Sequence, residues 1–494
     1  MRSTAGSRLF LAGYACCVLA SLYLLAWSVL PPLLIDSLPL DVTESLTWGR
    51  EWQWGYYKHP PLAPWVLHVF HMLLGKTGPF LLSQLCIALT LWLVWRTALR
   101  VMDRERAFLA AALTMAVAYY TRPALEFNHN IAQMPLWAAL GYSLLAALQD
   151  GRRRDWLLWG LCAGLGMLTK YSVAILLAVQ GLYLLFARRQ VFSQPGPYLA
   201  ALVGLAVFAP HLYWLWQTDW LPMAYASARA EATTAHPRWA ALGFLGTQVL
   251  NHLPLAVIAL LALSGARRAG AAQWRWHCRW PGYVLTLALG SGVLVTLLGV
   301  VTGARLRGMW GVPMWAFSAM LLMALWPQSW LAPARPRLLR GLALWLVSVS
   351  VLSGLALAYG AQWRQRPART DWPQAALAQN AQRTWQKLSH CPLDVVAGDD
   401  WLSGLVAATR ASGPSVLIGG DARLSPWVTP ERLRTRGGLW LWQTGDDPSG
   451  HAALMDRLPA DGSWHGGQWQ LRWPHDGEPW TLHWRAYVPA ACAR

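Results

Sequence analysis

The sequence predicts a polytopic α-helical membrane protein with a soluble α/β domain at its C-terminal end. Its 494 residues are 55% hydrophobic and only 13% charged, which is more apolar than the composition of soluble domains. Long apolar runs recur through the first 365 residues, whereas short apolar runs between turn formers follow from about residue 366. We therefore predict a membrane domain over residues 1–365 and a C-terminal domain over residues 366–494.

Eleven apolar runs predict membrane-spanning helices, because a span needs about 20 such residues and fewer inside a bundle. The first run follows Arg2 and Arg8, is longer than a signal-peptide core and lacks a small-residue cleavage site, so we expect a retained span. The runs cover residues 9–35, 79–99, 107–120, 131–148, 156–168, 171–186, 198–216, 242–263, 281–301, 309–326 and 338–359.

The formal charge of +18 is explained by membrane orientation rather than by nucleic-acid binding. The arginines cluster in alternate loops, at residues 100–106, 152–154, 188–189, 267–279 and 335–340. With the N-terminus inside, all five loops are cytoplasmic. Merging the runs 156–168 and 171–186 into one span would reverse every later loop. With all eleven spans kept separate, the outer side carries residues 36–78, 121–130, 169–170, 218–241 and 302–308, and everything after residue 360.

The first outer loop, residues 36–78, contains the most reactive groups. Within DVTESLTWGREWQWGYYKHPPLAPW, Asp41 and Glu44 share one face if the segment is helical. Lys58 precedes His59 and two prolines, which end a helix and restrict the backbone. An acid pair and a rigidly held cation suit an anionic substrate and a nucleophile that must lose a proton. The alternative is an amphipathic surface segment with solvated charges.

Two other outer segments carry ionisable groups next to predicted spans, where such groups are usually functional or paired. The second outer loop and its continuation, TRPALEFNHNIAQ, contain Arg122, Glu126, Asn128, His129 and Asn130. Arg305 and Arg307 lie where a later span begins; contact with lipid headgroups is the alternative for loop-end arginines. A divalent metal site formed by His59, His129, Asp41 and Glu44 is left open, although scattered ligand types are more often not metal ligands.

The C-terminal region resembles a small α/β domain. Residues 393–397 and 415–418 are short apolar runs followed by Gly-Asp turns, and residues 438–442, 467–473 and 480–485 alternate as strands do. We expect Asp399 and Asp400 to be turn residues. Cys391 and Cys492 are the only cysteines there, and they would form a disulfide if the region is exported.

Several motifs together resemble the bacterial membrane glycosyltransferases of the C-type fold. These are GYYKHPPL in the first outer loop, FNHNIAQMPLW at 127–137, GLCAGLGMLTKYSVAILL at 160–177, PHLYWLWQTDWLPMAYA at 210–226, and GDDWLSG and GGDARLSPWV in the C-terminal region. The group includes protein O-mannosyltransferases, aminoarabinose transferases acting on lipid A, and galacturonic acid transferases of the lipopolysaccharide core. The resemblance covers nearly the whole chain.

The resemblance implies inverting transfer of a sugar from a polyprenyl-phosphate donor, of the undecaprenyl-phosphate type, to a lipid A, glycan or protein acceptor. The reaction would take place at the periplasmic face of the bacterial inner membrane. Asp41 matches the general base, Glu44 its orienting neighbour, and Lys58 the contact to the donor phosphate. Arginines near that phosphate are matched loosely by Arg305 and Arg307. The remaining substrate-binding candidates are Tyr57, His59, Glu126, Asn128, His129 and Asn130.

Two other functions remain open from the residues alone. A transporter or flippase for a lipid-linked anion would use the same cations, but it should show internal repeats and polar groups at mid-membrane depth. A non-catalytic assembly subunit would leave Asp41 and Lys58 dispensable. A nucleotide-sugar donor is disfavoured, because the sequence has no Gly-rich loop of the phosphate-cradling type.

Overall fold

The computed structural model describes residues 2–231, 240–266, 274–304, 306–364, 367–444, 462–473 and 479–494. The chain forms two compact units. The first comprises residues 1–28, 58–62 and 81–353, and the second comprises residues 29–57, 63–80 and 354–494. The chain passes from the second unit into the first between Tyr57 and Lys58, within the polar segment that the sequence singled out.

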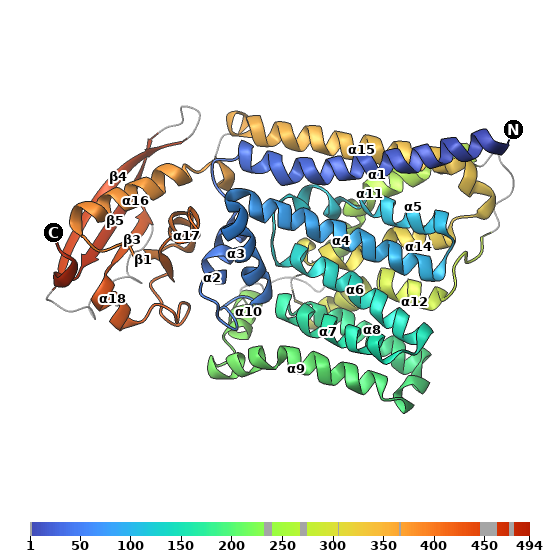
Figure 1. Ribbon diagram of the computed structural model, residues 1–494, viewed down its shortest axis with the longest axis horizontal. Helices are drawn as coiled ribbons and strands as arrows, with labels where there is room; N and C mark the ends of the chain where they lie inside the picture. The colour runs from blue at the N-terminus through green and yellow to red at the C-terminus, as the bar shows by residue number, and fades with distance from the viewer. Residues whose placement is uncertain are drawn as a thin grey trace. The chain divides into compact units, whose positions relative to one another are not determined.

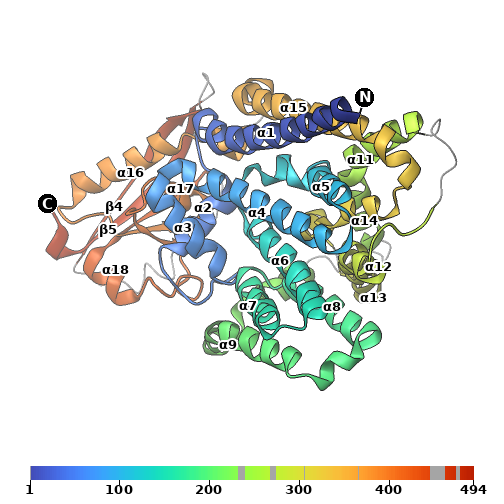
Figure 2. The same cartoon turned by 45° about the vertical axis from the view of Figure 1, so that its right-hand side comes forward.

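Apolar helices make up the first unit, and α1 runs alongside α15 in both views (Figures 1 and 2). The long helices are α1 (Arg2–Leu34), α4 (Gly78–Val101), α6 (His129–Asp150), α9 (Gly196–Gln217), α11 (Ala240–Ala266) and α15 (Gln328–Trp363). The short helices are α5 (Arg104–Thr114), α7 (Arg153–Thr169), α8 (Val173–Ala187), α10 (Leu221–Glu231) and α14 (Ser318–Leu325). A π-helical turn, η6 (Thr286–Gly290), joins α12 (Pro281–Leu285) to α13 (Ser291–Thr302).

Seven helices in the described chain are long and apolar enough to cross a membrane. An eighth span results if the 3₁₀ helix η7 (Gly308–Trp315) and α14, which are bent by 53°, form one broken span. Each of the eleven predicted runs coincides with a helix or a helix pair, but α5, α7 and α8 have only 11, 17 and 15 residues. α7 and α8 are separate helices that break at Lys170. The prediction of a polytopic helical membrane protein is confirmed.

One arginine that the sequence assigned to a charged loop is buried instead. Arg106, on α5, is 0% exposed and donates hydrogen bonds to the Trp326 carbonyl (2.8 Å) and to Gln328 Oε1 (2.9 Å). A helix end leaves its last carbonyls without helical partners, and here a guanidinium satisfies them at the end of α14. Arg106 therefore joins α5 to the α14–α15 turn.

The C-terminal part of the second unit contains a five-stranded sheet in the order β2-β1-β3-β5-β4. β1 is parallel to β2 and β3, whereas β5 is antiparallel to β3 and β4. The strands are β1 (Val395–Gly398), β2 (Ser415–Ile418), β3 (Gly438–Gln443), β4 (Ser463–Arg472) and β5 (Pro479–Val488). The five strand segments predicted from the sequence are all confirmed within a few residues.

Helices cover both faces of this sheet. α16 (Gln374–Leu388) and α17 (Asp400–Ala408) pack on one face through Trp385 and Leu402, and Figure 1 shows α16 lying across the strands. α18 (Pro430–Arg436) packs through Leu433 against Trp440 on the other face. A disulfide joins Cys391 to Cys492 with their Cα atoms 5.3 Å apart.

The second unit also includes two helices from the first outer loop, α2 (Leu40–Gly49) and α3 (Leu62–Leu74). A Cβ at Gly404 would lie 2.7 Å from Thr43 Cγ2, so the glycine allows α17 to approach α2 closely. Arg50 follows α2 and donates to the Ala411 carbonyl at 3.0 Å and to the Pro414 carbonyl at 2.8 Å. These contacts fix α2, which carries the acid pair, against the C-terminal fold.

Candidate functional site

Asp41 and Glu44 lie one turn apart on α2, on the same face as predicted, and both side chains are half-buried. The opposite face of the helix supplies Val42 and Leu46, which are 0% and 3% exposed. The segment folds this way because Pro39, with φ of −60°, precedes the first turn and the apolar residues recur at helical spacing. Asp41 lies in that first turn, where the helix dipole favours an ionised carboxylate.

Tyr57 is positioned by the N-terminal end of α17. Its hydroxyl donates to Asp400 Oδ2 at 3.2 Å, and Trp48 meets its ring edge-on with the ring centroids 5.7 Å apart. Asp399 caps α17 by accepting from the backbone N–H groups of Trp401 and Leu402, both at 3.0 Å. Asp399 is therefore a capping residue, and Asp400 orients the tyrosine that precedes Lys58.

In the first unit, His59 stacks on His129 with the ring centroids 4.0 Å apart and the planes inclined by 33°. Asn128 caps α6 by accepting from the N–H groups of Asn130 (2.8 Å) and Ile131 (3.2 Å), which places His129 at the first position of the helix. Burial lowers the pKa of His59 well below its ordinary value, and the charges of His129, Lys170 and Lys58 lower it further. His59 is therefore a neutral imidazole at pH 7.

Lys170 is a site residue that the sequence reasoning did not select. Its Nζ donates a hydrogen bond to Asn130 Oδ1, and the neighbouring Ser172 hydroxyl donates to Gln133 Oε1 at 2.8 Å. The break between α7 and α8 thus faces the beginning of α6. One signal was present: a lone lysine between two apolar runs is usually functional or paired, and the chain has only four lysines.

Lys58, the first residue of the 58–62 segment of the first unit, belongs to the same group as His59 and Lys170. Its Nζ lies 5.7 Å from the centre of the Tyr225 ring, within the range of a cation–π contact. We call Lys58, His59, His129, Asn130 and Lys170 the basic cluster. It gathers two ammonium groups, two imidazoles and an amide from three separated segments, so its chemistry suits an anionic group.

The structure places the other predicted residues as follows. Glu126 is half-buried in a segment whose Ala124 carbonyl accepts from Ser83 (2.7 Å) and Gln84 (2.8 Å). Arg307 is exposed next to η7, and Arg305 lies outside the described residues. Among the residues that the structure describes, no three His, Cys, Asp or Glu side chains are grouped so that they could hold a metal ion.

Comparison with known proteins places the basic cluster inside a family match. Residues 58–214 match the family described as dolichyl-phosphate-mannose-protein mannosyltransferase. The chain is 28% identical over 309 residues to the lipopolysaccharide core galacturonosyltransferase RgtB of Rhizobium johnstonii, which covers 56% of this chain and 58% of that protein. It is 28% identical over 256 residues to the undecaprenyl phosphate-alpha-4-amino-4-deoxy-L-arabinose arabinosyl transferase of Pseudomonas aeruginosa, covering 47% and 44%. The chain thus spans about half the length of the curated relatives it matches.

The structural similarity extends over almost the whole chain. ArnT from Cupriavidus metallidurans, solved bound to undecaprenyl phosphate, superposes with a TM-score of 0.63 at 16% identity. The match covers 95% of this chain and 97% of that one, and the same protein in the apo state gives a TM-score of 0.60. The protein is therefore a multi-pass membrane protein with the C-type fold of the membrane glycosyltransferases, the group that its sequence resembles.

Proposed function

We propose that this protein is an inverting glycosyltransferase that moves a sugar from a polyprenyl-phosphate carrier to a lipid A, glycan or protein acceptor. The observation that carries the proposal is the basic cluster, which presents two lysines within the family-matched segment. The names of the similar proteins support it, since they describe transfer from undecaprenyl phosphate and to lipopolysaccharide. We further propose that transfer occurs at the periplasmic face of the inner membrane, which agrees with the Cys391–Cys492 disulfide.

In this proposal the cations stabilise the leaving phosphate. As the bond from the sugar to the carrier breaks, negative charge develops on the phosphate oxygens, and preorganised ammonium groups lower the energy of that state. Lys58 is the primary phosphate contact, and Lys170, held by Asn130, supplies a second charge. Arg305 and Arg307 are proposed as further contacts. His59, His129, Asn128 and Glu126 complete the substrate-binding set, with neutral His59 available for hydrogen bonding.

The acid pair, Asp41 and Glu44, is assigned to activation of the acceptor hydroxyl. We assign Asp41 as the general base that accepts the proton of the acceptor hydroxyl, and Glu44 as the group that orients Asp41 or the sugar. Tyr57, fixed by its hydrogen bond to Asp400, is assigned to substrate binding beside Lys58. In this scheme the lysines supply positive charge to the leaving phosphate.

Native mass spectrometry combined with a transfer assay tests the proposal. The purified protein in nanodiscs should retain polyprenyl phosphate, and the mass of any sugar attached to it names the donor. Adding that donor with lipopolysaccharide should then produce a glycosylated acceptor. If no polyprenyl species is retained even after carrier lipid is added, and no transfer is seen, transport of a lipid-linked anion becomes the better account of the same cations.

Lys170→Met is expected to lower the transfer rate by about 10-fold. The substitution removes one charge from the phosphate environment, and a charge-assisted contact contributes about 1.5–3 kcal/mol. Lys387→Met is the matched control, because it removes the same charge from an exposed position on α16. Equal transfer rates for the two variants, measured at saturating acceptor, would remove Lys170 from the phosphate site.

A further inference from the structure

The helix α3 has its apolar side chains on the outside and its ionisable ones on the inside, the reverse of a helix on a water-facing surface. Its two histidines, His68 and His71, are each 6% exposed, whereas Leu73 is 74% exposed. At about 100° per residue, the outward arc of α3 is made entirely of apolar and aromatic side chains. These are Leu62, Trp65, Val66, Val69, Phe70, Met72 and Leu73.

α3 is as apolar as a membrane span, but it is not part of a straight one. With α4 it forms an apolar stretch of 40 residues, Leu62–Val101. At about 1.5 Å per residue a single helix of that length would measure about 60 Å, twice the hydrocarbon thickness of a bilayer. The stretch is interrupted at Gly75, whose φ of 55° is left-handed. α3 by itself has 13 residues and is about 20 Å long, too short to cross.

The turn between α3 and α4 is fixed to the end of another span. Lys76 Nζ donates a hydrogen bond to the carbonyl of Ile35, the residue that follows α1. Residues Cys17–Leu34 of α1 are long and apolar enough to cross a membrane, and Leu33 in the last turn is 74% exposed. The last turn of α3 therefore lies at the level where α1 leaves the membrane.

Two exposed indoles extend the outer surface of α3. Trp54 meets the Trp65 ring edge-on with the centroids 5.1 Å apart, and the Trp52 centroid lies 5.9 Å from the same ring. Trp52 and Trp54 are 51% and 45% exposed. Trp52 has a φ of 47°, an unfavourable conformation for a bulky residue, so the surrounding fold holds it in place. Indoles are enriched where a membrane meets water, because they combine an apolar body with a polar N–H.

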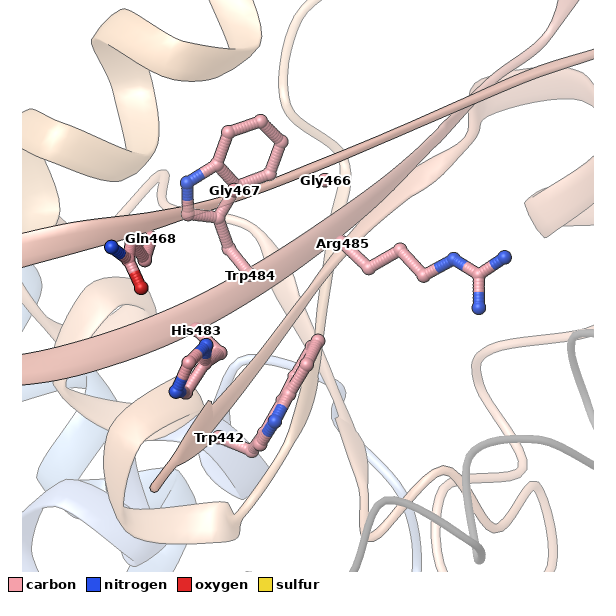
Figure 3. Close-up of a pocket in the computed structure, with 7 residues that line it drawn as sticks. All are labelled: Trp442, Gly466, Gly467, Gln468, His483, Trp484 and Arg485. Atoms are coloured by element: carbon pink, nitrogen blue, oxygen red, sulfur yellow. The ribbon is translucent and has the colours of Figure 1, made fainter.

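Another exposed aromatic surface of the same unit has a different composition. Trp442, His483 and Trp484 line an open depression on the sheet, where Gln468 and Arg485 lie beside the rings (Figure 3). Such polar neighbours suit water or a sugar, whose hydroxyls need hydrogen-bonding partners. The outward arc of α3, every residue of which is described, offers only the indole N–H of Trp65. Its composition therefore favours lipid over a glycan.

We propose that α3 is an interfacial helix whose outward arc lies among the headgroups and upper acyl chains of the leaflet that α1 reaches at Leu34. The protein covers the inner side, where His71 Nδ1 lies 3.0 Å from the Gly75 carbonyl oxygen. α2 crosses α3 closely, because a Cβ at Gly49 would lie 2.1 Å from the Pro64 carbonyl oxygen. The interfacial helix therefore also sets the depth of α2.

Nitroxide labels on the full-length protein in nanodiscs measure this depth. Single labels are placed at Val66→Cys, Val69→Cys and Leu73→Cys, after the cysteines outside the Cys391–Cys492 disulfide are replaced by alanine. Collision rates are measured with oxygen, which concentrates in lipid, and with a nickel chelate, which stays in water. Thermal unfolding of each variant is compared with that of the wild type.

Two further labels calibrate the scale. Gln468→Cys reports water, because this residue is exposed on β4, and Leu89→Cys reports lipid, because it is 47% exposed on α4. We expect the ratio of oxygen to nickel collisions on α3 to be at least 5-fold higher than at Gln468→Cys. A ratio equal to that at Gln468→Cys would place α3 in water and overturn the proposal. Low collision rates with both reagents would show that protein, such as a second copy of the chain, covers the helix, which also overturns it.

Photocrosslinking of the unsubstituted protein tests the same surface without labels. Nanodiscs contain phosphatidylcholine with a diazirine in the upper acyl chain, and adducts are located by mass spectrometry after digestion. Adducts on residues 62–74 should be at least 5-fold more abundant than on residues 463–472. Their absence while α4 is labelled overturns the proposal, as does their loss when a soluble oligosaccharide is added. Neither measurement requires transfer, so the interfacial helix stands even if the proposed function fails in every assay.

Discussion

Asp41→Asn is expected to lower sugar transfer by about 100- to 10,000-fold, the range that a positioned general base contributes. The amide has the shape of the carboxylate but cannot accept the proton of the acceptor hydroxyl. Loss of the interaction with the helix dipole by itself lowers the free energy of unfolding by about 0.3–1 kcal/mol. The rate is measured with excess donor and acceptor, and thermal unfolding is recorded for the same preparation.

Glu44→Gln provides the comparison, since Glu44 lies one turn along the same face of α2. We expect a smaller loss of rate, because its assigned role is to orient the base or the sugar. An Asp41→Asn variant that transfers sugar at the wild-type rate would refute the assignment of the base.

Lys58→Met is expected to weaken donor binding by about 100-fold, which corresponds to the upper part of the range for a charge-assisted contact. Methionine keeps an unbranched apolar chain that packs well against an aromatic ring such as Tyr225, so the change removes charge more than packing. Native mass spectrometry should show loss of the retained polyprenyl phosphate. Titration of added carrier lipid then gives the affinity.

A comparison of Lys58→Met with Asp41→Asn tests whether phosphate binding and proton transfer are performed by different residues. Asp41→Asn should retain the carrier lipid and fail in transfer, whereas Lys58→Met should lose the carrier lipid. Lys387→Met should do neither, because it lies on the exposed side of α16. Retention of the carrier by Lys58→Met at the wild-type level would show that other groups bind the phosphate.

The sequence by itself determined the class of this protein and most of its helices and strands. In a bilayer the backbone N–H and C=O groups of a spanning helix form their hydrogen bonds within that helix. The length and apolar composition of a span are therefore local properties of the sequence, and the apolar runs predicted the helices. Strand segments such as residues 415–418 were equally clear, since turn-forming glycines bound them. The pairing of Asp41 with Glu44 on one face and the constrained position of Lys58 also followed from local spacing.

Only the tertiary structure brought together groups that lie far apart along the chain. The hydrogen bond from Lys170 to Asn130 spans 40 residues, and that from Tyr57 to Asp400 spans 343. No local pattern encodes such pairs, because tertiary packing selects each partner from many polar side chains with similar local propensity. The sequence also placed Arg106 in a solvated loop because of its charge. In the structure Arg106 is buried, because it packs against the end of α14 and donates a hydrogen bond to the Trp326 carbonyl.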